Sequence, residues 1–249
     1  MLVLALDTTT PAGSAALWRD GRLLELRLAE SSVSYGQQLP GTLTELLAAH
    51  AASLGDVDVF GVASGPGSMT GLRVGIATVQ GLAPALGRPV VPVSALEALA
   101  VSVASRAGIR PGTRIGALTN ARRGEVFSAL YVASDGPLQE IDSPAVGVVE
   151  TVCARWHALV SSAPAAFVAD NVVQARAALE QWFGHSLLLF EGVPLAGVVA
   201  HLAAARYALG QVVSPHAIQP LYVRRTDAEV ARDRQRAKAD GAVPPEATR

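Results

Sequence analysis

The apolar run Val57–Ser64 leads directly into Gly65-Pro66-Gly67-Ser68-Met69-Thr70-Gly71-Leu72-Arg73-Val74-Gly75-Ile76-Ala77-Thr78, and this stretch decides the fold. A continuous apolar run predicts a buried strand, the glycines predict a tight turn, and residues from about Thr70 to Ala83 predict a helix. A strand, a glycine loop and a helix in this order can cradle a phosphate on backbone N–H groups. The spacing, however, matches neither common nucleotide signature. Leu72-Arg73 stand where a P-loop needs Lys and Ser/Thr, and the third glycine comes one residue late for a dinucleotide fingerprint.

The helix that follows the loop has two covered faces. Placed at 100° intervals, one face carries Gly71, Gly75, Thr78 and Leu82. The second carries Leu72, Ile76, Val79 and Ala83. A helix that is apolar on nearly all sides is covered on more than one side. We therefore expect the second face to pack on a sheet and the glycine face to let a neighbouring helix approach closely. That neighbour is either the helix of residues 39–54 or a partner, and the two helices together could present a partner surface.

Working outward from this stretch, apolar periodicity predicts an α/β fold with mixed sheets flanked by helices. A meander of strands at 2–6, 14–18 and 22–28 precedes a helix marked by Leu39, Leu43, Leu46, Leu47 and Leu54. A strand at 89–93 and a helix begun by a Ser94/Glu97 capping box follow. The second half repeats the pattern, with strands at 114–118, 126–132, 166–170 and 186–190 and helices at 150–161, 172–182 and 195–209. We expect lobes at 1–105 and 106–225 and a mobile charged tail at 226–249. The last segment of the second lobe could pack back on the first lobe.

Bulk composition excludes several classes of protein. Of 249 residues 50% are hydrophobic and 16% charged, which supports a substantial core. A net charge of −1 gives no general attraction to nucleic acid or to acidic membranes. The single cysteine, Cys153, excludes an internal disulfide and fits a reducing compartment. Residues 1–6 carry no basic region and are too short for a signal peptide or membrane span, so we expect a cytoplasmic protein.

Candidate catalytic residues have weak support. None of the five histidines is three or four residues from another, so the helical pair of histidines that binds metal is missing. Ser68 and Thr70 are better read as helix caps than as nucleophiles. Arg122, Arg123 and Glu125 follow a strand at a turn, and a solvated corner and a partner contact are about equally favoured there.

Three segments resemble the bacterial TsaB family: Val3-Leu4-Ala5-Leu6-Asp7-Thr8-Thr9, the block Gly65–Ala77, and Asn120-Ala121-Arg122-Arg123-Gly124-Glu125-Val126-Phe127, with a looser match at Pro220-Leu221-Tyr222-Val223-Arg224. The resemblance implies an actin-like, sugar-kinase-type fold of two ribonuclease-H-like lobes. It implies a complex that makes threonylcarbamoyladenosine beside the anticodon of tRNA. There TsaD transfers the threonylcarbamoyl group, TsaE is an ATPase, and TsaB is the non-catalytic dimerisation subunit that pairs with TsaD and self-associates when alone. The complex, rather than this chain alone, would contact tRNA.

The resemblance also implies site residues. The pairing surface would use the helices after the meander and the glycine block, with Leu39, Leu43, Leu46, Gly71, Arg73, Gly75, Thr78 and Leu82. TsaD-like transferases carry a His-x-x-x-His metal pair that this chain lacks, so we expect no catalysis, metal or intrinsic cofactor; a nucleotide would sit at the complex interface. Asp7, Thr8 and Thr9 read as a turn, with a weak nucleotide contact left open. The alternative function is an independent ATP-binding phosphotransferase of the same fold.

Overall fold

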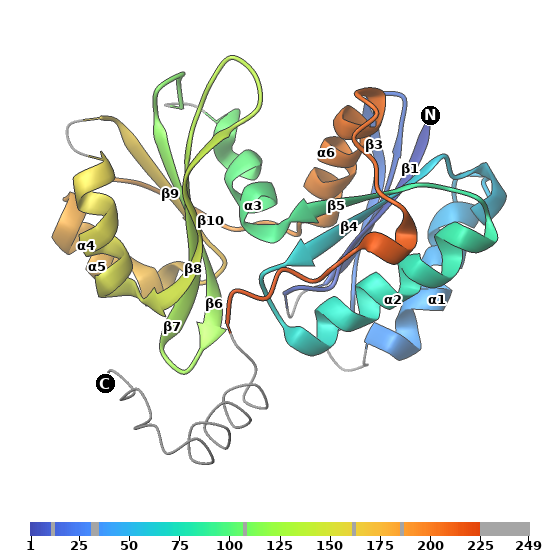
Figure 1. Ribbon diagram of the computed structural model, residues 1–249, viewed down its shortest axis with the longest axis horizontal. Coiled ribbons are helices and arrows are strands. Elements are labelled where there is room, and N and C mark those ends of the chain that lie inside the picture. The colour runs from blue at the N-terminus through green and yellow to red at the C-terminus, as the bar shows by residue number, and fades with distance from the viewer. Residues whose placement is uncertain (11–12, 31–34, 107–108, 161–162, 185–186, 225–249) are drawn as a thin grey trace, which may run out of the picture.

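The computed structural model describes residues 1–10, 13–30, 35–106, 109–160, 163–184 and 187–224. They form two lobes, each built on a five-stranded sheet (Figure 1). The charged tail expected at 226–249 lies outside the described residues. None of the helices within these ranges combines the length and the apolar character needed to cross a membrane.

The first sheet has the strand order β3-β2-β1-β4-β5. β1 (Leu2–Asp7), β2 (Ser14–Arg19) and β3 (Arg22–Leu28) form the expected antiparallel meander. β4 (Val59–Gly65) pairs in parallel with β1, and β5 (Val90–Ser94) pairs in parallel with β4. The five apolar residues of β1 are buried, as the continuous apolar run predicts, and Asp7 at its end is buried as well.

The second sheet repeats this topology. A meander of β6 (Arg114–Arg122), β7 (Glu125–Val132) and β8 (Gln139–Val148) is followed by β9 (Ala165–Ala169) and β10 (Leu188–Glu191), which extend it in parallel. The order β10-β9-β6-β7-β8 is that of the first sheet read from the other end. Because both sheets place a meander and two crossover strands alike, the fold is a duplicated ribonuclease-H-like, actin-like one.

Helices cover both sheets on two sides. α1 (Tyr35–Ala48) and α2 (Met69–Ala85) lie on the outer side of the first sheet, and α4 (Val149–Val160) and α5 (Val172–Phe183) on the outer side of the second (Figure 1). α3 (Ala95–Ala104) and α6 (Ala196–Ala208) lie between the sheets. The central core gathers residues of both helices and both sheets, and many of them are alanines. Small side chains let the elements approach closely, which fits the low aromatic content.

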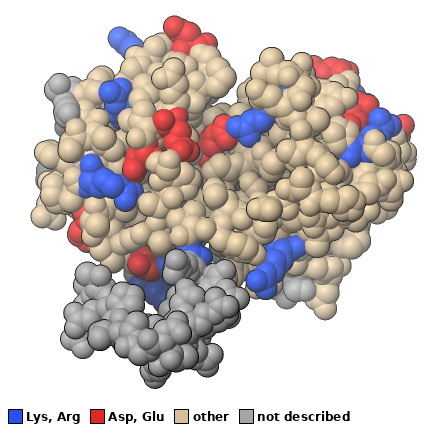
Figure 2. All heavy atoms as spheres, viewed as in Figure 1, with Lys and Arg blue, Asp and Glu red and all other residues tan. Residues whose placement is uncertain are grey.

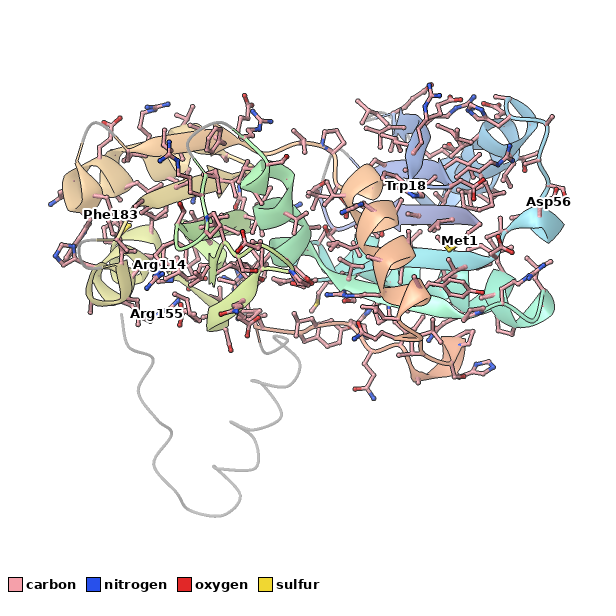
Figure 3. All side chains as sticks on the ribbon, turned by 90° about the horizontal axis from the view of Figure 1, so that it is seen from above. Met1, Trp18, Asp56, Arg114, Arg155 and Phe183 are labelled. Carbon is pink, nitrogen blue, oxygen red and sulfur yellow. The ribbon has the colours of Figure 1, made fainter. Side chains whose placement is uncertain are left out.

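α6 belongs to the first lobe rather than to the second. It packs against β1, β2 and β4, with Val199 and Ala203 beside Gly61. Figure 3 shows Trp18 of β2 beside this helix, with its ring centroid 5.4 Å from that of His201. The expected boundary at residue 105 does not assign α6 to the first lobe. Residues 1–105 alone leave the inner side of the first sheet partly uncovered, and α6 covers that side.

Three local expectations are corrected. The helix expected over 39–54 ends at Ala48; Ala51 has a φ of 50°, and Leu54 starts a separate 3-10 turn, Leu54–Asp56. β8 was not expected, because Asp142, Ser143 and Pro144 interrupt any apolar alternation. The Oδ2 atom of Asp142 accepts a 2.7 Å hydrogen bond from the indole N–H of Trp156, which satisfies this polar side chain inside the lobe.

The third correction concerns the start of α3. The hydroxyl of Ser94 accepts a hydrogen bond from the backbone N–H of Glu97, as a capping residue should. In the expected capping box the Glu97 carboxylate would accept a hydrogen bond from the backbone N–H of Ser94. Instead, it accepts hydrogen bonds of 2.6 and 2.7 Å from Nη2 of Arg206. This ion pair joins α3 to α6.

Candidate functional site

A cleft of about 950 Å³ lies between the lobes. We call it the interlobe cleft. Its lining comes from the turn after β1, the loop between β4 and α2, the tip of the β6–β7 hairpin, the segments after β9 and β10, and the last described residues. Several residues singled out from the sequence meet here: Thr9, Gly67, Ser68, Thr70, Arg122 and Arg123.

The glycine loop packs tightly on the turn after β1 of the same chain. A Cβ atom on Gly67 would lie 2.5 Å from the carbonyl oxygen of Thr9. A Cβ atom on Gly71 would overlap the carbonyl oxygen of Thr8, and one on Gly75 would overlap the Thr8 hydroxyl. The expectation that Gly71 and Gly75 admit a neighbouring helix is therefore wrong. They are needed because the Thr8–Thr9 backbone occupies the space where side chains would be.

Hydrogen bonds fasten this contact. The Thr8 hydroxyl donates to the carbonyl oxygen of Gly71 at 2.7 Å. The backbone N–H of Ser68 donates to the carbonyl oxygen of Thr9 at 2.8 Å. The Ser68 hydroxyl accepts from the backbone N–H of Gly71 at 3.3 Å, so Ser68 is the helix cap that the sequence predicts. Thr70 is exposed in the first turn of α2.

Asp7 is a buried turn residue. Its Oδ1 atom accepts from the backbone N–H and the hydroxyl of Thr9, at 2.8 and 2.6 Å, and Oδ2 accepts from the Thr10 hydroxyl at 3.4 Å. Burial raises the pKa of the Asp7 carboxyl above its usual 3.8, against the opposing effect of these hydrogen bonds. Within the described ranges, His, Cys, Asp and Glu side chains form no group of three or more that could hold a metal ion.

The β6–β7 hairpin brings two arginines to the mouth of the cleft. Arg122, Arg123 and Gly124 have φ values of 63°, 56° and 78°, and the backbone N–H of Arg122 donates to Oδ1 of Asn120 at 2.6 Å. Both arginine residues are exposed and line the cleft. Asp170, which follows β9, accepts from the Asn120 N–H at 2.9 Å and so holds the base of the hairpin. The turn position that the sequence indicates is thus a fixed corner of the cleft.

The last described segment of the chain joins the two lobes. Residues 213–224, here called the C-terminal strap, begin on the first lobe, where Val213 and Val90 exchange backbone hydrogen bonds of 2.9 and 3.3 Å. Further on, the N–H of Leu221 donates to the carbonyl oxygen of Ser64 at 2.7 Å. Without periodic apolar spacing, the only sequence signal for this segment is the loose motif at its end.

The strap ends on the second lobe. Nη1 of Arg224 donates to the carbonyl oxygen of Ala121 at 2.9 Å, and Nη2 forms an ion pair with Glu125. The guanidinium also lies 6.0 Å from the ring centroid of Phe127. Glu125 therefore binds the strap. On the first lobe, the Tyr222 hydroxyl lies 3.5 Å from Nε of Arg73.

The residues expected at a partner surface are mostly covered by the chain itself. Leu39, Leu43 and Leu46 are buried beneath α1, and Gly71 and Gly75 are buried against Thr8. This corrects the expectation that these side chains face a partner. Arg73 is exposed, whereas Thr78 and Leu82 are partly exposed.

Small and polar residues instead form the exposed sides of these two helices. α1 and α2 lie side by side on the outer side of the first lobe (Figure 1). We call their exposed rows the α1–α2 face, which comprises Gly41, Thr44, Ala48, Arg73, Ala77 and Gly81.

Comparisons with known proteins agree with this fold. The sequence model of the family described as TsaD, tRNA N6-adenosine threonylcarbamoyltransferase, matches residues 29–232. The tRNA threonylcarbamoyladenosine biosynthesis protein TsaB of Escherichia coli (strain K12) is 32% identical over 235 residues, covering 90% of this chain and 95% of the relative. TsaB of Haemophilus influenzae is 29% identical over 230 residues, covering 90% and 94%.

Solved structures are similar as well. The structure described as YeaZ from Pseudomonas aeruginosa has a TM-score of 0.72 at 30% identity, covering 89% of this chain and 99% of that one. A second Pseudomonas aeruginosa structure, of a protein with similarity to peptidase YeaZ, has a TM-score of 0.75 at 31% identity, covering 90% and 99%. Sequence and structure thus match over about nine-tenths of the chain, which belongs to the TsaB family.

Proposed function

We propose that this chain is the non-catalytic subunit that pairs with a TsaD-type transferase and activates it in the synthesis of threonylcarbamoyladenosine in tRNA. Family membership supports the pathway, since relatives of 32% and 29% identity carry that name. The transferase family's own sequence model also matches most of the chain, so the proposed partner shares its ancestry. A TsaE-type ATPase joins the same complex in this proposal, and the isolated chain pairs with itself.

The observation that carries the non-catalytic role is that two amides of the glycine loop and one of the turn after β1 are donated within the chain. A phosphate cradle needs backbone N–H groups that point at the ligand. Here the N–H of Ser68 is donated to Thr9, that of Gly71 to the Ser68 hydroxyl, and that of Thr9 to Asp7. These amides are therefore not available to a nucleotide, which disfavours the alternative of an independent phosphotransferase.

The α1–α2 face supplies a surface for the partner. Its small side chains allow another helix to approach closely, since the distance between packed helices depends on the side chains at the contact. A Cβ atom at Gly41 or Gly81 would meet open space, so these glycines are not required by the chain's own packing. Arg73 adds a charge at one end of the face.

Co-purification with a TsaD-type protein, followed by a tRNA modification assay with each component omitted, tests this function. Gly81→Arg should abolish pairing and modification while the fold persists, because the new side chain enters open space. Gly81→Ala should pair normally. Gly136→Arg, at an exposed turn of the second lobe, is the matched control. Equal modification with and without this chain would refute the proposal.

A further inference from the structure

The mouth of the interlobe cleft is basic, although the chain as a whole has a net charge of −1. Arg122 and Arg123 are exposed there. Among the described residues that line the cleft, Asp170 is the only acid, and it accepts hydrogen bonds from Thr119 and Asn120. The nearby carboxylate of Glu125 is paired with the strap. Figure 2 shows basic side chains along the lower edge of both lobes, where Figure 1 places the hairpin tip and the start of α2.

Turn chemistry does not explain why arginine occupies these two positions. Both residues adopt a left-handed backbone, which favours Gly, Asn or Asp over longer side chains. A two-residue hairpin turn is served best by Asn-Gly or Asp-Gly. The chain nevertheless keeps two successive guanidinium groups at this corner. The left-handed backbone therefore does not account for arginine at either position.

The chemistry of this mouth fits phosphate groups on an extended ligand. Guanidinium groups bind phosphate oxygens through paired N–H donors. In the glycine loop, the amides of Ser68 and Gly71 are already donated within the chain. The positive charge at the cleft comes from the two exposed guanidinium groups at its rim. A rim site suits a polyanion larger than the cleft itself. Tyr222, a residue that is 43% exposed, also lines the cleft.

An exposed aromatic ring that lines the same cleft as exposed basic groups suits single-stranded nucleic acid, since bases stack on aromatic rings and phosphates contact cations. We propose that Arg122, Arg123 and Tyr222 bind a single-stranded part of the RNA substrate. This inference rests on the proposed function, and it gives the chain a direct contact with RNA within the complex. Two cations and one ring make a weak site, so the contact adds to binding by the partner.

The experiment measures binding of an anticodon stem–loop RNA to the assembled complex between about 50 and 200 mM salt. The double variant Arg122→Asn/Arg123→Asn suits the left-handed backbone and removes two charges. Each lost phosphate contact lowers the slope of log K against log salt by about 0.7, so we expect a reduction of about 1.4. The charge-matched control is Arg22→Asn/Arg176→Asn, which changes an exposed residue at the start of β3 and an exposed residue of α5. This control should leave the slope unchanged.

A second variant separates stacking from charge. Tyr222→Leu should weaken RNA binding by about five-fold or more and leave the salt slope unchanged, because stacking is not ionic. An unchanged slope in the arginine variant, or equal effects in its control, would overturn the proposal. The proposal would also be overturned if ATP or inorganic triphosphate saturated the arginine-dependent site and displaced the RNA from it. The site would then be one for small phosphate compounds.

The two proposals fail separately. Co-purification with the transferase is measured first for every variant, and the arginine variant should pair normally. Loss of pairing in that variant would assign the hairpin to the protein interface and overturn the RNA contact. If the unchanged chain does not pair at all, the proposed function fails, and the same salt titration on the isolated chain still decides whether these arginines contact RNA.

Discussion

Replacing Gly75 by alanine places a methyl group against Thr8. The new Cβ atom would lie well inside 3.0 Å of the Thr8 hydroxyl oxygen, a separation that real Cβ atoms essentially never show. The hydroxyl would have to retreat by about 1 Å to reach ordinary contact. Moving it also breaks its buried 2.7 Å hydrogen bond to Gly71.

The expected magnitude follows from three contributions. Overpacking costs about 1–3 kcal/mol, and the lost hydrogen bond costs about 1 kcal/mol. Alanine in place of glycine inside a helix returns about 1 kcal/mol. We therefore expect Gly75→Ala to lower the free energy of unfolding by about 1–3 kcal/mol. Gly81→Ala, in the same helix but facing open space, should raise it by up to about 1 kcal/mol.

A double-mutant cycle locates the clash at one atom. Thr8→Ala removes the hydroxyl and leaves the Thr8 Cβ atom 3.5 Å from the new methyl group, which is ordinary contact. Gly75→Ala should then cost about 1–2 kcal/mol less than in the wild type. Gly71→Ala should not be rescued, because its Cβ would overlap the main-chain oxygen of Thr8. Urea unfolding followed by circular dichroism measures each value. Additive effects, or a Gly75→Ala protein as stable as Gly81→Ala, would refute this reasoning.

Three further changes test other parts of the molecule. Burial raises the pKa of Asp7 above 3.8, so the folded state binds this proton more tightly than the unfolded state does. The stability that this group contributes is therefore lost as the pH rises from about 4. Asp7→Asn should flatten the fall in the free energy of urea unfolding between pH 4 and 7, and an unchanged slope would contradict this. Burial raises the pKa of the Cys153 thiol to about 12, so iodoacetamide at pH 8 should label the unfolded chain but not the native one, as mass spectrometry would reveal. Arg123→Asn should raise the midpoint of thermal unfolding, because asparagine adopts a left-handed backbone more readily; a lower midpoint would show that the arginine side chain stabilises the hairpin.

Much of the fold could be predicted from apolar periodicity. The ten strands of the described chain include nine that the sequence indicates, because each carries a continuous or alternating apolar run. β8 escapes this reasoning because it carries several polar residues, among which Asp142 is satisfied by a hydrogen bond from Trp156 of α4. The place of α6 escapes it as well. Periodicity reveals that a helix has an apolar face but not which sheet covers that face.

The site shows the same limit. Glycine spacing on α2 correctly indicates a close approach, but spacing cannot say that the approaching atoms are those of Thr8, more than 60 residues earlier. The arginine corner stands out in the sequence as a turn, yet its position at the cleft depends on how the lobes meet. The strap has no periodic signal because its backbone hydrogen bonds, such as that of Leu221 to Ser64, belong to no regular element.

The return of α6 and the strap to the first lobe has a consequence for synthesis on the ribosome. Ile218, near the end of the described chain, is buried in the same cluster as Leu4. The first lobe therefore cannot complete its core until Ile218 has been made. All five strands and both outer helices of the second lobe are continuous in sequence from Arg114 to Glu191, so that lobe can finish first. The growing chain must keep the exposed apolar strands of its beginning from aggregating in the meantime, a demand that chaperones meet for nascent proteins.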